Sequence, residues 1–517
     1  MLLDFKTFHD KVLGCWTGKN IGGVLGAPFE CSRDVYDVTF YTQDLSKGPP
    51  PNDDLDLQIV WLAAVERYGR NVSSSILGEY WLSFVIPHWV EYGMGKTNLR
   101  AGLRPPLSGV VDNNFKDSCG CFIRSEIWAC LAPGHPEIAA RYAYEDATVD
   151  HADEGMYGEI FFAAMQSAAF AVSDKDALVE IGLSYIPEGC AVTRCVREAQ
   201  NCYREKAPFT EMRKRIHSAA PGCFGVISKK ISQIDESDLE RGRPGFDAPE
   251  NIGFTIAAWY YGEDDFGKSL CLAVNCGEDT DCTAATLGAL LGIISGASAL
   301  PEKWTAPLGD IIETMCIDKT AWGAIWIPKT TKELTDRVLR VAPSFLGLDL
   351  CDLFAPGGYT VDMLPGDMMT CPREDEYLPL TAGSDIDKKI PIYRLISSPY
   401  IIRQEYPAFR VEIDYHDGPF FKTGIPKNLT VTVSDNGYTK QQQWVTIRLW
   451  LPDGVSASGG KEFSLPMNYN YGSKAEASFE FTDTEHFTSG KIELIVDISL
   501  NARHSAAPVK IVLMRSA

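Results

Sequence analysis

The chain has 517 residues, of which 48 are basic and 69 acidic, so its formal net charge is −21. This charge repels phosphate backbones and anionic lipid headgroups, which argues against general binding to nucleic acids or membranes. One phosphate-bearing small ligand is not excluded, because a local site can oppose the global field. The length exceeds that of one ordinary core, and we expect two to three domains.

The N-terminus mixes charged and apolar residues and lacks the features of a signal peptide. No uncharged apolar stretch reaches the roughly 18–20 residues that span a bilayer. The best candidate, residues 12–27, is interrupted by Lys19 and Asn20. The 15 cysteines are scattered through helix-like segments, which indicates reduced thiols in a cytoplasmic protein. Cys119 and Cys121 lack a second matching pair, so we predict no zinc site there.

Residues 5–354 have the patterns of helices. Residues 55–65 and 157–170 are apolar on nearly every face, as expected for helices inside a large bundle. Residues 279–296 are rich in small side chains, which suits a helix that its neighbours approach closely. Glycines recur every four residues at positions 14, 18, 22 and 26. They lie one above another if helical, and because each weakens the helix, we expect another element to pack against them.

The composition changes after residue 355. Residues 356–384 contain many prolines and glycines, which predicts a linker. Short alternating or β-branched runs follow at 410–415, 429–433, 444–451, 478–481, 492–498 and 509–513, and Asp435-Asn436-Gly437 is typical of a turn. We therefore predict a helical domain at 1–355, a linker at 356–384 and a β-sandwich domain at 385–517.

Two acidic clusters each precede an apolar helical pattern. Asn52-Asp53-Asp54 precedes residues 55–65, and Asp279-Thr280-Asp281 precedes residues 282–296. Helix capping explains either cluster alone, because Asn and Asp favour N-caps and acids suit the positive end of the helix dipole. If the two helices pack side by side, up to four carboxylates converge, and only a cation makes that tolerable. Oxygen ligands favour Mg²⁺, Mn²⁺ or Ca²⁺ over zinc.

Three of these segments resemble those of the ADP-ribosylglycohydrolase family. Residues 14–30, GCWTGKNIGGVLGAPFE, are similar to the family's glycine-spaced opening, which ends in a Pro-x-Glu element. Asn52-Asp53-Asp54 resembles the family's Thr-Asp-Asp motif. Residues 277–296, GEDTDCTAATLGALLGIISG, are similar to its Asp-Thr-Asp helix.

The middle of the chain extends this resemblance. Residues 123–126, 133–134 and 150–158 occur in the order found in a broad branch of bacterial relatives. The match covers roughly residues 8–345 and leaves the β domain outside. It implies an all-α orthogonal helical bundle that holds Mg²⁺ or Mn²⁺, as one or two ions.

The resemblance also implies roles for individual residues. The metal ligands would be Asp53, Asp54, Asp279 and Asp281. Glu30 matches a family glutamate on a mobile loop over the site, so we place Glu30, Asp53 and Asp54 in the catalytic set. Arg124, His151 and Asp153 fall in segments that line the family's ligand pocket, and we expect them to bind substrate.

Three residues depart from the family pattern. Asn52 stands where Thr is usual, although its carboxamide oxygen could still bind a cation. Cys282 also replaces a ligating Thr, and a neutral thiol is a poor partner for a hard cation. We keep both as candidate metal ligands. Gly23 replaces a common Asp. These departures leave open the second metal ion and the standard protein-ADP-ribose substrate.

Other candidates have structural alternatives. His151 lies among acidic residues, so a partnered structural histidine and a ligand-binding one both remain open. Arg124 lies in an apolar stretch, where a carboxylate or a substrate phosphate would each satisfy it. Trp444 and Trp450 share one face of a predicted strand, which fits a sugar platform or plain packing.

We predict a divalent-metal-dependent hydrolase of a ribosyl-type glycosidic bond. The metal would bind vicinal sugar hydroxyls beside a water, and Glu30 or an aspartate ligand would accept the water proton. Nearby carboxylates would stabilise an oxocarbenium-like transition state. A second hypothesis is a glycosidase or nucleoside hydrolase that acts on a non-protein ribosyl or other sugar substrate. A third is a non-catalytic protein that binds an ADP-ribose-like ligand, against which the repelling carboxylates argue. The oligomeric state is left open.

Overall fold

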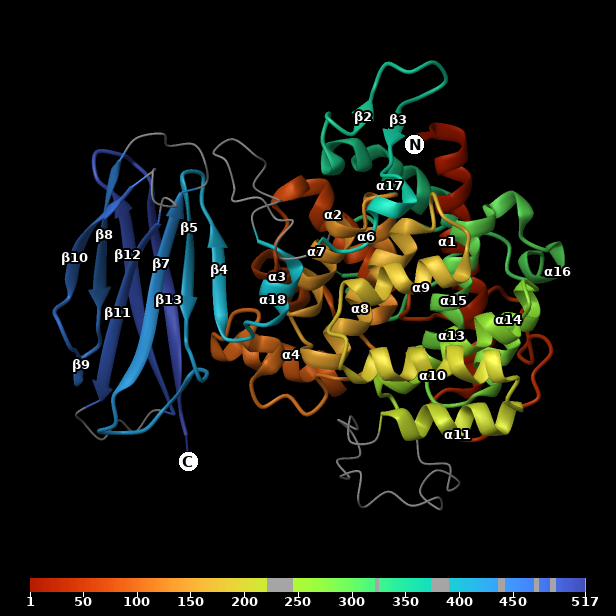
Figure 1. The fold of residues 1–517 in the computed structure, drawn as a ribbon, viewed down its shortest axis with the longest axis horizontal. Coiled ribbons are helices and arrows are strands. Elements are labelled where there is room, and N and C mark those ends of the chain that lie inside the picture. Colours follow the sequence, from red (N-terminus) through yellow and green to blue (C-terminus); the bar gives the residue numbers. More distant parts are fainter. Residues whose placement is uncertain are drawn as a thin grey trace. The chain divides into compact units, whose positions relative to one another are not determined.

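The computed structural model describes residues 1–220, 245–320, 325–372, 390–435, 442–468, 474–483 and 490–516. It contains two compact units. The first comprises residues 1–96 and 112–371, and the second comprises 97–111 and 372–517. The first unit is mostly helical and the second is built mainly of strands (Figure 1), which confirms the predicted fold class.

The first unit consists mainly of helices, with long non-helical segments at residues 30–55 and before α17. Its longer helices are α1 (Phe5–Gly26), α2 (Asp56–Tyr68), α3 (Ser74–Phe84), α6 (Ser125–Leu131), α7 (Pro136–Ala147), α8 (Asp153–Ala168), α9 (Lys175–Ser184), α10 (Ala191–Glu205), α11 (Phe209–Ala219), α13 (Ala248–Tyr261), α14 (Phe266–Asn275), α15 (Thr280–Ser295) and α17 (Thr331–Leu346). Shorter elements are η1 (Ala27–Phe29), η2 (Gly69–Asn71), η3 (Phe122–Arg124), η5 (Ala297–Ala299), α16 (Glu302–Thr305) and η6 (Gly366–Met368). Strands β1 (Leu2–Asp4), β3 (Thr360–Asp362) and β2 (Cys351–Asp352) form a small sheet in that order.

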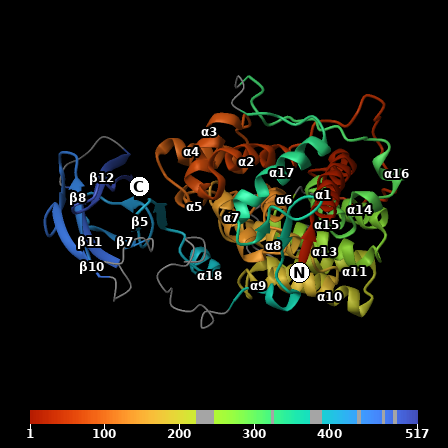
Figure 2. The same ribbon diagram turned by 90° about the horizontal axis from the view of Figure 1, so that it is seen from above.

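The glycine-spaced helix α1 packs against α15 with almost no side chains between the two backbones. A Cβ atom added at Gly18 would lie 2.0 Å from the carbonyl oxygen of Gly288, and one added at Gly22 would lie 2.0 Å from that of Ala284. This approach confirms that a neighbouring element presses on the glycine face. Figure 2 shows α1 and α15 side by side. The contact continues to Gly26, beside Thr280, so it brings the end of α1 to the start of α15.

The apolar segments fold as predicted. Residues 55–65 lie largely in α2, 157–170 largely in α8 and 279–296 largely in α15. Each helix buries side chains on nearly every face, because other helices surround it. Among the described residues, none of the helices is both long and apolar enough to span a membrane.

The second unit contains two five-stranded sheets that share one hydrophobic core, as expected for a sandwich. One sheet has the order β4-β5-β7-β11-β9 and the other β10-β8-β12-β13-β6. The strands are β4 (Ile401–Glu405), β5 (Phe409–Asp414), β6 (Phe420–Phe421), β7 (Lys427–Asp435), β8 (Gln443–Trp450), β9 (Val455–Ala457), β10 (Glu462–Met467), β11 (Lys474–Asp483), β12 (Lys491–Leu500) and β13 (Ala506–Arg515), preceded by the short α18 (Ile392–Ile396). Each strand predicted from the sequence lies in one of them. Of the predicted turn, Asn436 and Gly437 lie outside the described residues.

The unit boundaries differ from the predicted boundary at residue 355. Helix α4 (Val90–Ala101) runs from the first unit into the segment 97–111, which ends with α5 (Leu107–Val110). This segment belongs to the second unit because Leu103, Leu107 and Val111 join the core of the two sheets. The first unit continues to Cys371, since β3 pairs with β1 at the N-terminus. Of the predicted linker, residues 373–384 lie outside the described residues.

Candidate active site

The first acidic cluster forms a tight turn before α2. The backbone N–H of Asp54 donates to Asn52 Oδ1 at 2.7 Å, and that of Asp56 donates to the carbonyl oxygen of Asp53 at 3.0 Å. The Asp54 side chain is only 2% exposed. Neither of its carboxylate oxygens accepts a hydrogen bond from the residues that the structure describes. Gly23 lies directly against this turn, because a Cβ atom there would be 3.1 Å from Asp54 Oδ2.

The second acidic cluster caps α15. Gly277 and Glu278 have φ angles of 74° and 69°, so the chain turns sharply before Asp279. Asn251 Oδ1 accepts a hydrogen bond from the Asp279 N–H at 3.1 Å and fixes the end of this turn. Asp281 lies in the first turn of α15, where its Oδ1 accepts a hydrogen bond from the Cys282 N–H at 3.0 Å. Both aspartates are buried.

The two clusters and Glu30 converge on one place. Burial raises the pKa of Asp281 well above its usual value, and the neighbouring carboxylates of Glu30, Asp54, Asp279 and Asp53 raise it further. Burial also raises the pKa of Asp54 well above its usual value, and the carboxylates of Asp53, Asp279 and Glu126 add to this effect while Lys19 opposes it. The structure therefore brings together five carboxylates from three segments that lie far apart in the sequence. Helix α1 contacts both clusters, because Gly26 lies against Thr280 and Asp281 and Gly23 lies against Asn52 and Asp54.

Glu30 occupies the open side of this cluster. It follows η1 and its side chain is exposed. Partial burial, together with the carboxylates of Asp279 and Asp53, raises the pKa of Glu30 to about 7. A carboxylate with this pKa can take up a proton near neutral pH, which is the property that a general base needs.

A buried lysine lies beneath the cluster. The Lys19 side chain is fully buried in α1, and its Nζ lies 3.1 Å from Glu126 Oε1 and 3.9 Å from Asp54 Oδ1. Burial alone would lower the pKa of Lys19, but these carboxylates raise it instead, so the amine stays charged. Gln166 Nε2 also donates to Glu126 Oε1, at 3.2 Å. The sequence signal for this residue is a lysine in the segment 12–27, which is otherwise largely apolar or made of small residues.

The donor set fits a hard divalent cation. Both oxygens of Asp54 and Oδ1 of Asp279 are buried without a hydrogen-bond donor among the described residues. Such oxygens cost free energy unless a cation or another donor meets them. Carboxylate oxygens are the ligands that Mg²⁺ and Mn²⁺ prefer. Asn52 Oδ1 is used by the Asp54 N–H, and Asn52 Nδ2 is buried without an acceptor among the described residues.

Cys282 and Cys119 flank Asp279. A ligand atom from each of Asp279, Asp281 and Cys282 lies within 4.8 Å of the others. Burial and the adjacent carboxylates raise the pKa of the Cys282 thiol well above its usual value, which keeps it protonated. The thiols of Cys282 and Cys119 both hydrogen-bond to the Asp279 carboxylate. Cys282 as a metal ligand stays a prediction, and its thiol is a weaker candidate than the carboxylates.

Arg124 and His151 belong to a separate buried cluster. Arg124 forms two hydrogen bonds with Asp150, at 2.9 and 3.1 Å, and its NH2 lies 3.0 Å from Asp146 Oδ1. His151 Nδ1 lies 3.0 Å from Asp150 Oδ1, and Nε2 is 3.0 Å from the Ser118 hydroxyl. Both side chains are fully buried. These contacts fit a carboxylate-paired Arg124 and a structural His151. Direct substrate binding by either residue stays a prediction.

Asp153 lies at the N-terminus of α8 and forms an ion pair with Lys116. Both residues line a cavity of about 420 Å³ that also includes Tyr157 and Cys190. None of the converging carboxylates lines this cavity. The structure therefore does not bring Asp153 into the carboxylate cluster, and its role in substrate binding stays a prediction.

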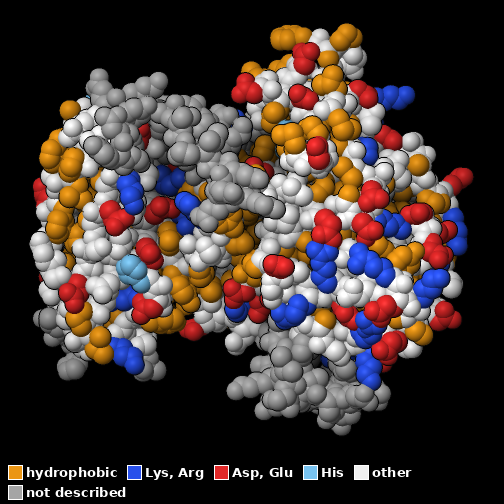
Figure 3. Space-filling model, in the orientation of Figure 1, with side chains coloured by type: hydrophobic (Ala, Val, Ile, Leu, Met, Phe, Trp, Pro, Cys, Tyr) orange, Lys and Arg blue, Asp and Glu red, His pale blue; other side chains and the backbone are white. Residues whose placement is uncertain are grey.

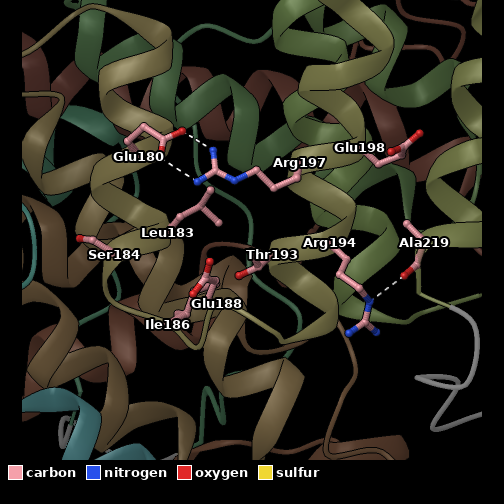
Figure 4. Close-up of a pocket in the computed structure, with 10 residues that line it drawn as sticks. All are labelled: Glu180, Leu183, Ser184, Ile186, Glu188, Thr193, Arg194, Arg197, Glu198 and Ala219. Carbon is pink, nitrogen blue, oxygen red and sulfur yellow. Dashed lines mark hydrogen bonds and ion pairs between the residues drawn. The ribbon is translucent and has the colours of Figure 1, made fainter.

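Another cavity, of about 690 Å³, lies between α9 and α10 (Figure 4). Both of its arginines have partners within the protein. Arg197 NH2 pairs with Glu180 at 2.7 Å, and Arg194 donates to the carbonyl oxygens of Ala219 and Gly189 at 3.0 and 2.7 Å. It holds none of the predicted site residues. On the face of the helical unit in Figure 3, acidic and basic side chains are interspersed.

Comparison with known proteins identifies a family whose model matches more than half of the chain. The family model described as ADP-ribosylglycohydrolase matches residues 5–341. The chain is 26% identical over 225 residues to an uncharacterized protein of Archaeoglobus fulgidus, which covers 41% of this chain and 59% of that protein. It is also 33% identical over 86 residues to the ADP-ribosylarginine hydrolase Tri1 of Pseudomonas putida (strain GB-1). This match covers 16% of this chain and 20% of the relative. The matches thus span less than two thirds of the length of either curated relative.

A similar solved structure is described as an ADP-ribosylglycohydrolase-related protein complex. It is 19% identical to the chain with a TM-score of 0.42, and the match covers 66% of this chain and 100% of that one. The matched residues of the family model include both acidic clusters and Glu30.

Proposed function

The chain belongs to the ADP-ribosylglycohydrolase family, and on this basis we propose that it is a divalent-metal-dependent hydrolase of a ribosyl-type glycosidic bond. The observation that carries the proposal is the convergence of Asp53, Asp54, Asp279 and Asp281 with Glu30. Within this group, both oxygens of Asp54 and Oδ1 of Asp279 are buried without a donor among the described residues. Five carboxylates at one place repel one another, so their retention makes physical sense where a cation binds.

We assign the metal to these aspartates. Asp53, Asp54, Asp279 and Asp281 would hold one or two Mg²⁺ or Mn²⁺ ions, and Asn52 would hold Asp54 in place through its hydrogen bond. A bound ion would supply Lewis-acid polarisation and a fixed place for sugar hydroxyls and a water. Lys19 balances part of the charge of Asp54 and Glu126, and it opposes the effect of burial, which raises the pKa of Asp54.

Glu30 would act as the general base. Its pKa of about 7 and its exposed position allow it to accept a proton from a water that attacks the anomeric carbon. Positive charge develops on the sugar ring as the glycosidic bond breaks, and the carboxylates of Asp53 and Asp279 would stabilise it. As the glycosidic bond breaks, the leaving group would take up a proton, which Glu30 can return once it has accepted it from the attacking water.

The first substrate class to test is ADP-ribose linked to arginine. The similarity to an ADP-ribosylarginine hydrolase supports this choice. A ribosylated small molecule, a nucleoside or another glycoside is the second candidate. Gly23 and Cys282 depart from the family's usual residues, and residues 372–517 of the second unit lie outside the family match. A ligand-binding protein without turnover is the third.

A panel assay separates these candidates. Wild-type protein and the Asp279→Asn variant are incubated with ADP-ribosylated arginine and serine peptides, nucleosides and nitrophenyl pentosides, each with and without Mn²⁺. We expect cleavage of one substrate class only with Mn²⁺ and only by wild type. Turnover that is equal in the folded variant would contradict the assignment of Asp279. Tight binding of ADP-ribose with no cleavage by either protein would favour the ligand-binding alternative.

A further inference from the structure

Five charged or titratable side chains form a second buried cluster around Glu278, the residue that precedes Asp279. Glu278 Oε1 accepts a hydrogen bond from Arg33 Nε at 2.5 Å, and lies 3.5 Å from both Arg213 NH2 and His217 Nε2. Glu250 accepts from Arg33 NH2 at 3.1 Å and lies 2.5 Å from His217 Nδ1. All five residues are buried. The cluster thus contains a network of ion pairs centred on Glu278.

This network does not have the character of a cation site, although His217, Glu250 and Glu278 offer ligand atoms within 4.8 Å of one another. The two guanidinium groups already balance the two carboxylates, and a further cation would lie against them. A Cβ atom at Gly245 would lie 2.3 Å from Glu278 Oε2 and 2.5 Å from Arg33 NH2. The backbone of Gly245 therefore closes the network from one side.

The network joins two segments of the candidate active site. Ser32 and Glu278 form a β-bridge, in which the Cys31 N–H donates to the carbonyl oxygen of Glu278 at 3.1 Å and the Glu278 N–H donates to that of Ser32 at 2.6 Å. Cys31 and Glu278 both have left-handed φ angles, of 64° and 69°, which non-glycine residues adopt only where neighbouring contacts enforce them. The Arg33–Glu278 pair supplies such a contact.

Two residues of the candidate active site lie next to this β-bridge in the chain. Glu30 precedes the bridge by two residues on one side, and Asp279 follows it directly on the other. We propose that Arg33 and Glu278 are positioning residues, which lock the Glu30 segment to the Asp279 turn and so fix the proton acceptor and the metal ligands relative to one another. The inference rests on the proposed function, because it assigns these residues a role in metal binding.

The test measures metal binding and backbone protection in the full-length chain. Arg33→Met removes the guanidinium, and Glu278→Gln keeps the side-chain volume but removes the charge. Arg337→Met is the matched control, because Arg337 forms a similar two-point ion pair with Glu66, at 2.8 and 2.7 Å, near the other end of α2 from Asp54. Mn²⁺ affinity is measured by calorimetry on protein that circular dichroism shows to be folded. Hydrogen exchange is followed in residues 27–36 and 275–283.

We expect Arg33→Met and Glu278→Gln each to weaken Mn²⁺ binding about 10- to 100-fold, as loss of a residue that orients metal ligands does. The Mn²⁺ affinity of the double variant should be no more than twofold lower than that of the weaker-binding single variant, since the pair acts as a unit. Exchange should rise in both segments together, and Arg337→Met should change neither quantity. If one variant does not fold, the other carries the test. Unchanged Mn²⁺ affinity and exchange in either folded variant would overturn the inference. A wild type that binds no Mn²⁺ would instead overturn the proposed function.

Discussion

Asp281→Asn tests whether the converging carboxylates form a metal site. The Asp281 side chain is 5% exposed, and its Oδ1 accepts the Cys282 N–H at 3.0 Å, which an asparagine Oδ1 can also do. The substitution therefore removes charge while it keeps shape and hydrogen bond. Without metal, the variant should be at least as stable as wild type above neutral pH, because one repelling carboxylate is lost.

The expected magnitude follows from ligand linkage. Mn²⁺ at 100 times its Kd should stabilise wild type by about 2.7 kcal/mol. For a unit of this size, roughly 2 °C of Tm corresponds to 1 kcal/mol, so Mn²⁺ should raise the Tm by about 5 °C. In Asp281→Asn this increase should fall to about 1 °C or less at the same Mn²⁺ concentration.

Differential scanning fluorimetry with and without Mn²⁺ measures both quantities, in chelator-treated protein. Asp56→Asn is the matched control. Asp56 is also a buried acid near the first cluster, but its Oδ2 accepts the N–H groups of Met315 and Cys316 at 2.7 and 2.5 Å. We expect Mn²⁺ to raise the Tm of this control as much as that of wild type. A full increase of about 5 °C in folded Asp281→Asn would refute the reasoning, because Asp281 would then be no ligand.

Three further predictions concern stability. Metal-free protein should lose stability as pH rises through about 7. Burial raises the folded-state pKa of Glu30 to about 7 and also raises that of Asp281, so the folded state binds protons more tightly than the unfolded state. Thermal melts from pH 5.5 to 8.5 that show stability rising with pH would contradict this. Gly22→Ala should cost about 1–3 kcal/mol or more in urea denaturation, since its Cβ would lie 2.0 Å from a carbonyl oxygen, whereas Gly189→Ala has open space and should cost less than about 1 kcal/mol. Lys19→Met should cost about 3–5 kcal/mol by the same denaturation assay, because it removes the cation beside two buried carboxylates; a loss below about 1 kcal/mol would show that the ion pair is dispensable.

The sequence predicts the helices and strands well where a local pattern is strong. Residues 55–65 and 157–170 are apolar on nearly every face and lie largely in helices α2 and α8. The glycine spacing at residues 14–26 predicts the close approach of another helix, and α15 provides it. The identity of that partner is not in the local pattern, because any helix with small residues could have met the glycines.

Long-range pairs account for the rest of the site. Lys19 was visible only as a charge in an apolar segment, and its partner Glu126 lies more than a hundred residues away. Arg33 and Glu278 are 245 residues apart and carry no motif that links them. The segment 97–111 joins the β unit through Leu103, Leu107 and Val111, whereas its helical pattern alone suggests the first unit.

The most direct test of the central claim compares the Mn²⁺ dependence of hydrolysis with the Mn²⁺ affinity of the same preparation. Chelator-treated wild type is titrated with Mn²⁺ while hydrolysis of ADP-ribosyl-arginine, or of the substrate found in the panel, is followed. The Mn²⁺ concentration that gives the half-maximal rate is set against the Kd from calorimetry. We predict no hydrolysis without metal and agreement of the two constants within about threefold. Hydrolysis that persists at full rate in the metal-free protein would contradict a metal-dependent mechanism at the converging carboxylates.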